Sequence, residues 1–318
     1  MNTMARVAMK TMPRAAMERV RGAAILLAML VAALAAAVAV TVFADQQRWS
    51  RTVEYRRDQV QAQALAMAGL QWARQIVEDD GRRSSVDHLG EPWALTLPPI
   101  PMEDGEIRGA IVDAQGLLNL NALGLAGESA PERSRLARLF ARLGAPAASA
   151  DVVADWTDED AVPREAGAED AYYLEQSVPH LAPNAPMVRV AELTAAKGLT
   201  PRAVAAVLPF VSALPQGTTV NVNTAPPEVL AAIVDDLAPE RIEALLADRA
   251  RKPFTTVAEF RARLPSGAKL ASDAGLGVAS NYFLISIEAR QGTTHARARA
   301  LVRRSGGARL VIVWQTVE

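Results

Sequence analysis

The sequence predicts an α+β fold, in which a long N-terminal helix packs on an antiparallel sheet and a large all-α insertion domain interrupts that sheet. Three observations support this prediction. An apolar run starts at residue 22 and continues, without a proline, into an amphipathic stretch that ends near residue 81. Strand-like segments lie on both sides of a long middle region. That middle region has helical periodicity.

The composition is that of a folded protein with balanced charge. The 318 residues include 34 basic and 35 acidic side chains, and 50% of the residues are hydrophobic. This balance argues against a protein that coats nucleic acid over a broad surface. Cysteine is absent, which excludes disulfides and metal sites built on thiolates.

The run from Gly22 to Ala44 predicts one transmembrane helix. It contains no charged residue and would be about 34 Å long as a helix, enough to cross a bilayer core. The preceding residues are mainly basic, so the positive-inside rule places residues 1–22 in the cytoplasm and the bulk of the chain across the membrane. A secretory signal peptide would have a shorter apolar core of roughly 7 to 15 residues.

The helix is expected to continue beyond the membrane to Gly81, a good C-terminal stop. Apolar residues recur there at three- and four-residue steps, and polar residues occupy the positions between them. We therefore expect a helix of about 57 residues, with its first half in lipid and its second half against a globular head. The apolar stripe is formed by Leu65, Ala66, Gly69, Leu70, Trp72, Ala73, Ile76 and Val77.

Five segments have strand character. Turn signals at residues 291–292 and 305–307 join the last three into an antiparallel meander. In residues 293–304 small or apolar side chains alternate with mainly basic ones, which predicts a strand with one solvated face. The five segments are Trp93–Leu97, Glu106–Asp113, Asn281–Arg290, Thr293–Arg304 and Ala308–Val317.

The middle region, residues 115–273, contains an internal repeat. Leu118–Asn121 and Val220–Asn223 share the order apolar, Asn, apolar, Asn, and residues 189–193 correspond to residues 256–260. The first copy is longer because an acidic loop interrupts it. Asn side chains at such positions hydrogen-bond nearby backbone and start helices, which is a purely structural role.

The second copy also resembles the helix-hairpin-helix modules of competence-type DNA receptors. Those modules bind phosphate through a glycine-containing hairpin, where backbone N–H groups approach the oxyanion. Here the hairpin position is occupied by residues 235–239, which begin with Asp235 and Asp236. Two carboxylates would repel phosphate, so no nucleic-acid partner is expected.

The acidic segment between residues 151 and 187 is a candidate calcium site. It holds nine acidic residues and one basic residue, Arg164. Clustered carboxylate oxygens suit Ca²⁺, which takes roughly six to eight oxygen ligands. The spacing does not fit an EF-hand, and a solvated acidic loop without metal is the alternative. The candidate ligands are Asp155, Asp158, Asp160, Glu169 and Asp170.

The sequence contains no pattern typical of an enzyme. Its three histidines lie far apart, and the common nucleophile, phosphate-loop and zinc-helix motifs are absent. We therefore expect a protein without catalytic residues.

A basic leader that ends at Gly22, followed by an apolar segment and one long helix, resembles the type IV pilins and type II secretion pseudopilins. In that family a prepilin peptidase cleaves after the glycine and methylates the new N-terminus, which by position is Ala23. The family usually has Glu as its fifth mature residue, and this sequence has Leu27 there. The resemblance implies a pilin-like helix and sheet.

Within that group the sequence resembles the general secretion pathway protein K family of minor pseudopilins. That family lacks the fifth-position Glu, has a large head and is associated with calcium. The Asn-Leu-Asn segment, the acidic Trp motif and the later Asn-x-Asn-Thr segment are typical of it. The implied organisation is a leader at 1–22, a transmembrane helix at 23–44, a pilin-like helix and first strands at 45–114, an α-helical insertion at 115–273 and C-terminal strands at 274–318.

The resemblance implies a subunit at the tip of the type II secretion pseudopilus that initiates or caps the fibre for export of folded proteins from the periplasm. It would be a single-pass inner-membrane protein with a periplasmic head. Its partners would be other minor pseudopilins, the major pseudopilin, the prepilin peptidase and the inner-membrane assembly platform. A membrane-anchored DNA receptor and a minor tip pilin of a type IV pilus are the alternatives.

Overall fold

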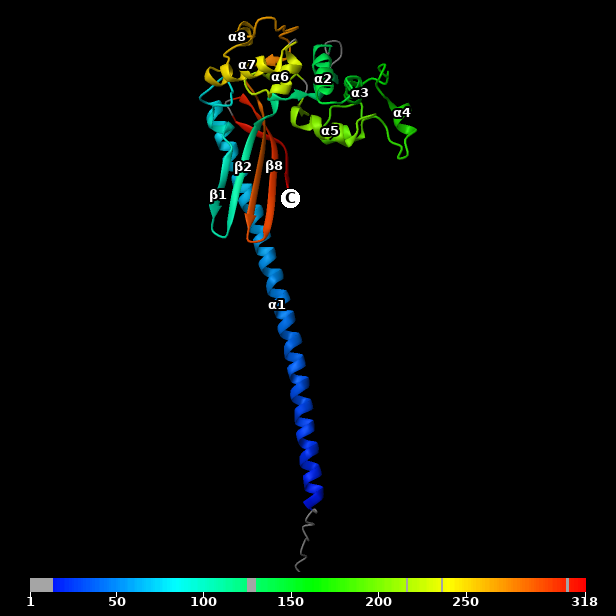
Figure 1. Ribbon diagram of the computed structural model, residues 1–318, viewed down its shortest axis with the longest axis vertical. Coiled ribbons are helices and arrows are strands. Elements are labelled where there is room, and N and C mark those ends of the chain that lie inside the picture. Colours follow the sequence, from blue (N-terminus) through cyan, green and yellow to red (C-terminus); the bar gives the residue numbers. More distant parts are fainter. Residues whose placement is uncertain (1–13, 125–129, 216, 236, 307–308) are drawn as a thin grey trace, which may run out of the picture. The chain divides into compact units, whose positions relative to one another are not determined.

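The computed structural model describes residues 14–318 except 125–129, 216, 236 and 307–308 (Figure 1). Most of the predicted leader, residues 1–13, lies outside the described part. The chain divides into two compact units, Met1–Val60 and Gln61–Glu318. Helix α1 (Arg14–Gly81) is continuous in the chain across the boundary between them.

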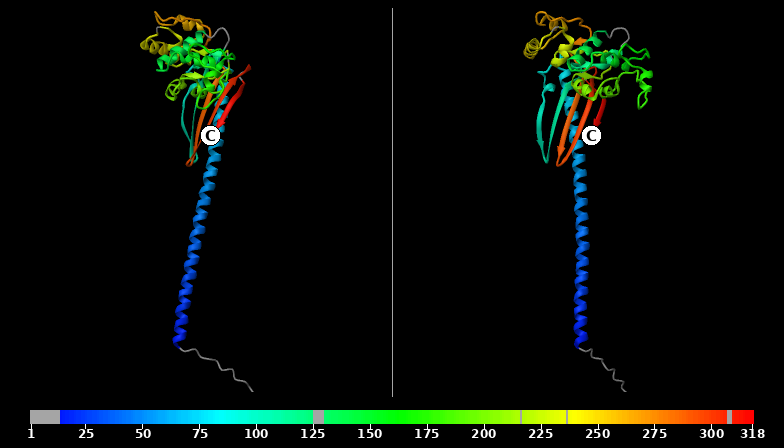
Figure 2. Two further views of the ribbon diagram at one scale, coloured as in Figure 1. Left: turned by 90° about the vertical axis from the view of Figure 1, so that its right-hand side faces the viewer. Right: turned by 45° about the vertical axis from the view of Figure 1, so that its right-hand side comes forward.

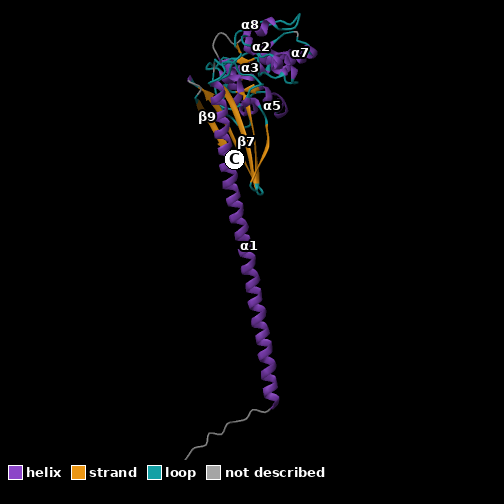
Figure 3. Ribbon diagram, turned by 90° about the vertical axis from the view of Figure 1, so that its left-hand side faces the viewer, coloured by secondary structure: helices purple, strands orange, loops and turns teal. Residues whose placement is uncertain are grey.

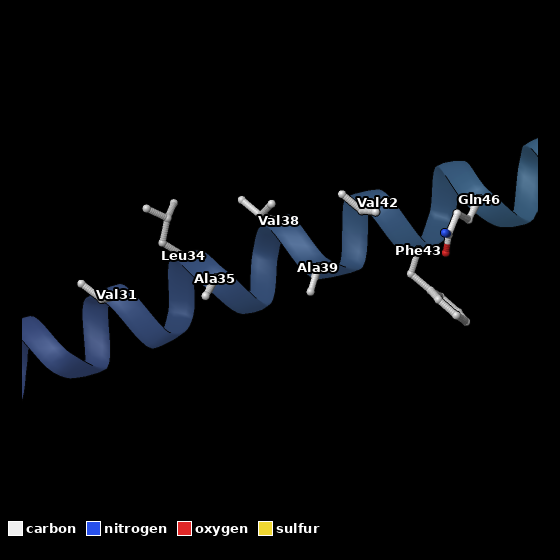
Figure 4. A pocket seen from close by; sticks show the side chains of 8 residues that line it. All are labelled: Val31, Leu34, Ala35, Val38, Ala39, Val42, Phe43 and Gln46. Carbon is white, nitrogen blue, oxygen red and sulfur yellow. The ribbon is translucent and has the colours of Figure 1, made fainter.

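In the first unit, α1 exposes an apolar surface on all sides. Its side chains from Ala23 to Val42 are exposed, and the stretch from Ala23 is long and apolar enough to cross a membrane. Figure 4 shows Val31, Leu34, Val38 and Val42 along one side of this helix, with Gln46 where the polar part begins. An apolar helix surface that no protein segment covers is suited to lipid or to neighbouring helices.

The second unit contains a five-stranded antiparallel sheet in the order β1-β2-β7-β8-β9. Its strands are orange in Figure 3. The last part of α1 covers one face of the sheet. Ala62, Ala66, Leu70, Ala73 and Val77 from the helix are buried against the inward side chains of β7 and β8. The strands are β1 (Leu97–Met102), β2 (Gly105–Asp113), β7 (Tyr282–Gln291), β8 (Thr294–Arg304) and β9 (Leu310–Val317).

The predicted α+β class, the helix end at Gly81 and the last three strands are confirmed. The predicted alternation in β8 is also confirmed, since its small residues are buried and His295, Arg297 and Arg299 are exposed. The helix stripe needs one correction, because the Trp72 side chain is 51% exposed.

The predicted strand Trp93–Leu97 is wrong. Residues Pro92–Ala94 form a 3₁₀ turn, and strand β1 starts at Leu97. Pro92 favours the helical turn because its φ is preset. Trp93 is buried and its indole N–H donates to Glu91 at 2.9 Å. The prolines in β1 are compatible with a strand because β1 lies at the edge of the sheet.

The insertion lies at the end of the sheet where β2 ends and β7 begins (Figure 2). It has its own apolar core and two short parallel ladders, β3 with β4 and β5 with β6. Its ladders are β3 (Leu118–Asn119), β4 (Val211–Ser212), β5 (Val220–Asn221) and β6 (Leu276–Gly277). Its α-helices are α2 (Ala130–Arg142), α3 (Ser149–Thr157), α4 (Asp170–Leu174), α5 (Pro201–Val207), α6 (Pro227–Ile233), α7 (Pro239–Arg251) and α8 (Val257–Ala262).

The two copies of the predicted internal repeat contain equivalent hydrogen bonds. Asn121 accepts a bond from the main-chain N–H of Met187 at 2.8 Å and donates to its C=O at 2.9 Å. Asn223 does the same with Phe254, at 2.8 and 2.9 Å. Each asparagine therefore closes its copy of the repeat by imitating a paired strand residue.

Candidate functional site

The acidic segment is anchored by its aromatic residues. Helix α3 brings Trp156 into edge-on contact with Tyr173 of α4, with ring centroids 5.4 Å apart. The ring of His180 stacks on Tyr173 at 4.9 Å. These contacts fix both ends of the loop that carries the acidic residues.

Asp155 is bound to Arg164 and is fully buried. The carboxylate accepts bonds from the Arg164 guanidinium and from the Arg164 main-chain N–H. The same guanidinium also pairs with Asp158. The one basic side chain of the segment thus neutralises part of its negative charge, and Asp155 already has its partners.

Three of the five predicted ligands come together. Asp158, Asp160 and Glu169 each offer a carboxylate oxygen, and these oxygens lie within 4.8 Å of one another. Glu169 is only 5% exposed, and neither of its carboxylate oxygens has a hydrogen-bond partner among the described residues. The Oδ1 atom of Asp158 is likewise buried without a hydrogen-bond partner among the described residues.

Burial, helped by the negative charges of Asp155, Asp158 and Asp160, raises the pKa of Glu169 to about 7, although the nearby Asn184 side chain acts in the opposite direction. Buried oxygens without donors are costly, and a hard cation satisfies them. The residues present therefore fit Ca²⁺.

Asn184 joins this cluster and was missed from the sequence. Its Nδ2 donates to the main-chain oxygen of Asp160 at 2.9 Å, and its Oδ1 is buried without a partner in the described structure. Asn184 has φ of 43°, a left-handed conformation that asparagine tolerates. Its position between two nearby prolines was the available signal for a fixed turn.

Asp170 lies outside the cluster. Its Oδ1 accepts the main-chain N–H of Ala182 at 2.8 Å and so holds the returning chain. The structure thus groups Asp158, Asp160 and Glu169, and gives Asp155 and Asp170 other partners.

A second group of buried carboxylates lies at the end of α1. Asp80, Asp87 and Glu91 could also face a cation, but Arg304 pairs with Asp80 at 3.1 Å and with Asp87 at 2.8 Å. Burial raises the pKa of Asp80 to about 6, with Glu91 and Asp87 adding to the effect. The Arg304 guanidinium therefore supplies the positive charge of this group in place of a metal ion, and it joins β8 to Asp80 of α1.

The processing residues lie in α1. Ala23 and Leu27 are exposed on the helix, and cleavage after Gly22 stays a prediction. At the hairpin position of the second repeat, Asp235 pairs with Arg138 at 2.7 Å, and Asp236 lies outside the described residues.

Sequence comparisons cover both repeats and most of the chain. Two sequence models, both described as type II secretion system (T2SS), protein K, match residues 116–216 and 220–279. Type II secretion system protein K of Pseudomonas aeruginosa is 33% identical over 85% of this chain and 85% of its own length. The Klebsiella pneumoniae protein of the same name is 31% identical over 91% of this chain and 94% of its own length.

The fold is similar to a chain in the crystal structure of the GspK-GspI-GspJ complex from enterotoxigenic Escherichia coli. The TM-score is 0.73 at 27% identity, and the match covers 85% of this chain and 99% of the other. Sequence and fold agree along nearly the whole length. The chain belongs to the type II secretion system protein K family.

Proposed function

We propose that this chain is a minor pseudopilin that assembles with I-type and J-type subunits of its own secretion system, as the related E. coli complex suggests. Residues 23–44 would anchor it in the inner membrane and its head would lie in the periplasm. The apolar surface of α1 supports this proposal, because lipid and neighbouring helices can both cover it. The proposed role is structural and needs no catalytic residue.

We infer further that the subunit occupies the tip of the fibre. The observation that carries this step is the position of the insertion at the end of the sheet next to the end of α1. There the main-chain N–H of Asp87 donates to Val278, and Asn221 donates to the main-chain oxygen of Asp87 at 3.0 Å. A further subunit placed beyond this end of α1 would meet the insertion.

Leu27 supports the same position. In related fibres a Glu at this place neutralises the N-terminal amine of a neighbour, and an unpaired charge in lipid is costly. A subunit with Leu27 cannot perform this neutralisation, so it suits the end of the fibre.

Two experiments test the proposal. Mass spectrometry of the mature protein is expected to give an N-terminus at Ala23, and a Gly22→Leu variant should keep its leader. The Leu27→Glu variant should initiate fibres less well than wild type when the other minor pseudopilins are co-expressed. A mature protein that begins beyond residue 44 would contradict the anchor, and unchanged initiation would contradict the role of Leu27.

We also propose that Asp158, Asp160, Glu169 and Asn184 hold Ca²⁺. The ion would supply positive charge to buried oxygens that lack donors. The four side chains themselves join the end of α3, the acidic loop, the start of α4 and the returning segment. Holding these parts together would fix the first repeat of the insertion.

A further inference from the structure

The two edge strands of the five-stranded sheet differ in how well they are protected against pairing with a further strand. Edge strand β1 contains Pro98, Pro99 and Pro101, which have no N–H to offer an added strand. Edge strand β9, with the sequence LVIVWQTV, contains no proline and no charged residue. Proteins usually protect a free edge with prolines or charges. This chain protects β1 in that way and leaves β9 unprotected.

Part of the outer main chain of β9 is free to pair. Glu318 and Arg297 exchange two main-chain hydrogen bonds, at 2.8 and 2.9 Å. Because such pairs alternate along an antiparallel ladder, the main-chain groups of Gln315 and Val317 point away from β8. A bulge at Val313 shifts the register, so the main-chain N–H and C=O of Ile312 also point away from β8.

In the described structure, α1 forms hydrogen bonds with the outward main chain of β9 at its first residue, and the Gln315 side chain also contacts Met67 of α1 at 3.2 Å. The N–H of Leu310 donates to Glu78 Oε1 at 3.0 Å, and its C=O accepts from Arg74 Nη2 at 3.3 Å. No side chain of the described residues caps the outer main chain of Ile312, Gln315 or Val317. The apolar side chains along this edge are also exposed: Val311, Ile312, Val313 and Val317.

A cleft of about 480 Å³ lies beside the outer face of β9. Trp314 and Leu301 line it from the sheet, and Val188, Arg189 and Leu208 line it from the first repeat of the insertion. The Arg189 guanidinium lies 5.6 Å from the centre of the Trp314 ring. Side chains of a strand added to β9 would therefore contact apolar residues of the cleft and the Arg189 guanidinium.

The outer face next to β9 carries two outward-facing arginines of β8, and Glu318 lines the same cleft. Arg299 and Arg303 of β8 face outward opposite Thr316 and Val311 of β9. Both are exposed, and among the described residues the ion pairs of β8 are formed by Arg297 and Arg304 instead. Acidic side chains on the same face of an added strand would complement Arg299 and Arg303.

We propose that β9 accepts an extended segment of a neighbouring subunit of the assembly. The segment adds to the sheet edge through main-chain hydrogen bonds to Ile312, Gln315 and Val317. Its acidic side chains lie on the face of Arg299, and its apolar side chains lie on the opposite face beside Ile312 and Val317. This inference rests on the proposed function, because it names a surface through which the assembly forms.

A permanent subunit suits this edge better than an exported protein does. An exposed apolar edge promotes aggregation, so it has to stay covered, whereas an exported protein binds and leaves. A second copy of the chain fits less well. Antiparallel pairing of two β9 strands would turn the packed parts of the two α1 helices in opposite directions, and two copies anchored in one membrane run in the same direction.

The test uses the full chain in detergent, mixed with the I-type and J-type subunits of the same secretion system. Gln315→Pro removes an outward N–H and leaves the bonds to β8 intact, and Gln315→Ala is the matched control that keeps the N–H. We expect at least tenfold weaker assembly for Gln315→Pro and wild-type assembly for Gln315→Ala. Ile312→Lys, which keeps the main chain and charges the same edge, should also weaken assembly.

Hydrogen exchange provides an independent measurement. The amides of Gln315 and Val317 should exchange at least tenfold more slowly in the complex than in the free chain, and Arg299→Glu should weaken assembly most at low salt. If the complex forms but these amides exchange at the free rate, or Gln315→Pro assembles like wild type, the β9 inference is wrong and the proposed function stands. If the wild-type chain forms no complex with these subunits, both fail. Pairing of two copies through β9 would also overturn the inference.

Discussion

The carboxylate of Asp155 lies directly against Gly167 and occupies the space that a Cβ at residue 167 would need. A Cβ at this position would fall 1.7 Å from Asp155 Oδ2. The close approach lets the Asp155 carboxylate reach both donors of Arg164 while fully buried. The glycine is therefore required by a buried ion pair and not by an unusual backbone angle.

Gly167→Ala is expected to lower the free energy of unfolding by about 3 to 5 kcal/mol, because it displaces Asp155 from Arg164 and leaves a buried charge unpaired. Chemical denaturation of the full chain measures the loss. Gly306→Ala is the control, since a Cβ there meets no described residue within 4 Å, and it should change stability by no more than about 0.5 kcal/mol. Equal stability of the two variants would contradict the role of Gly167.

Calcium should stabilise the protein, and more strongly at pH 8 than at pH 6. Burial raises the pKa of Glu169 to about 7, so its carboxyl is mostly protonated at pH 6 and must lose a proton to bind the ion. At a calcium concentration of 100 times Kd the expected gain is about 2.7 kcal/mol. Thermal unfolding with and without calcium at the two pH values provides the measurement.

The control for this prediction is an exposed acid of the same loop. Glu169→Gln should abolish the calcium-dependent shift of Tm, and Glu165→Gln should keep it, because Glu165 is exposed and lies outside the carboxylate cluster. The calcium proposal does not survive if Glu169→Gln responds to the ion as wild type does.

Asn223→Ala should destabilise the second repeat by about 2 to 4 kcal/mol. The substitution leaves the main-chain N–H and C=O of Phe254 without their partner, and Phe254 is buried. Denaturation of the full chain measures the effect. Asn281→Ala is the matched control because the Asn281 side chain is exposed. A similar loss in both variants would show that the clamp on Phe254 is not the cause.

Asp113 should make stability fall as pH rises from about 4 to 6. Burial raises its pKa to about 6, although Ser280 and Thr224 donate to it at 2.6 Å and act in the opposite direction. In this pH window the folded chain holds a proton that the unfolded chain has lost, which costs up to about 1.4 kcal/mol per pH unit. Asp113→Asn should flatten the slope of unfolding free energy against pH. An unchanged slope would show that Asp113 is not its source.

Much of the fold could be predicted because its signals are local or periodic. The apolar run and the stripe on the second half of α1 follow from spacing alone, and so does the alternation along β8. The repeated Asn pairs marked both copies of the insertion. The strand predicted from Trp93 was wrong because Pro92 starts a 3₁₀ turn. Trp72 was wrongly placed in the buried stripe because periodicity cannot show where the sheet ends beside the helix.

The candidate site was only half predictable. Acidic residues close in sequence gave Asp158, Asp160 and Glu169, but sequence distance alone could not separate them from Asp155, whose partner Arg164 is chosen by the loop geometry. Asn184 was missed because the returning chain brings it to Asp160 from 24 residues away. Which carboxylates share an ion depends on burial and on competing donors, and both arise only in the folded chain.

The chain leaves the sheet at Asp113 and re-enters it at Tyr282, and Asp113 faces Phe283, the next residue, across the β2–β7 pair. A two-residue hairpin turn can join residues that lie so close. If such a turn replaced the helical insertion, β1, β2, β7, β8 and β9 would form a continuous antiparallel meander beside α1. The larger protein is therefore built like a small pilin-type head into which the helical part enters and leaves at one place in the sheet, with added contacts at Asp87 and Trp314.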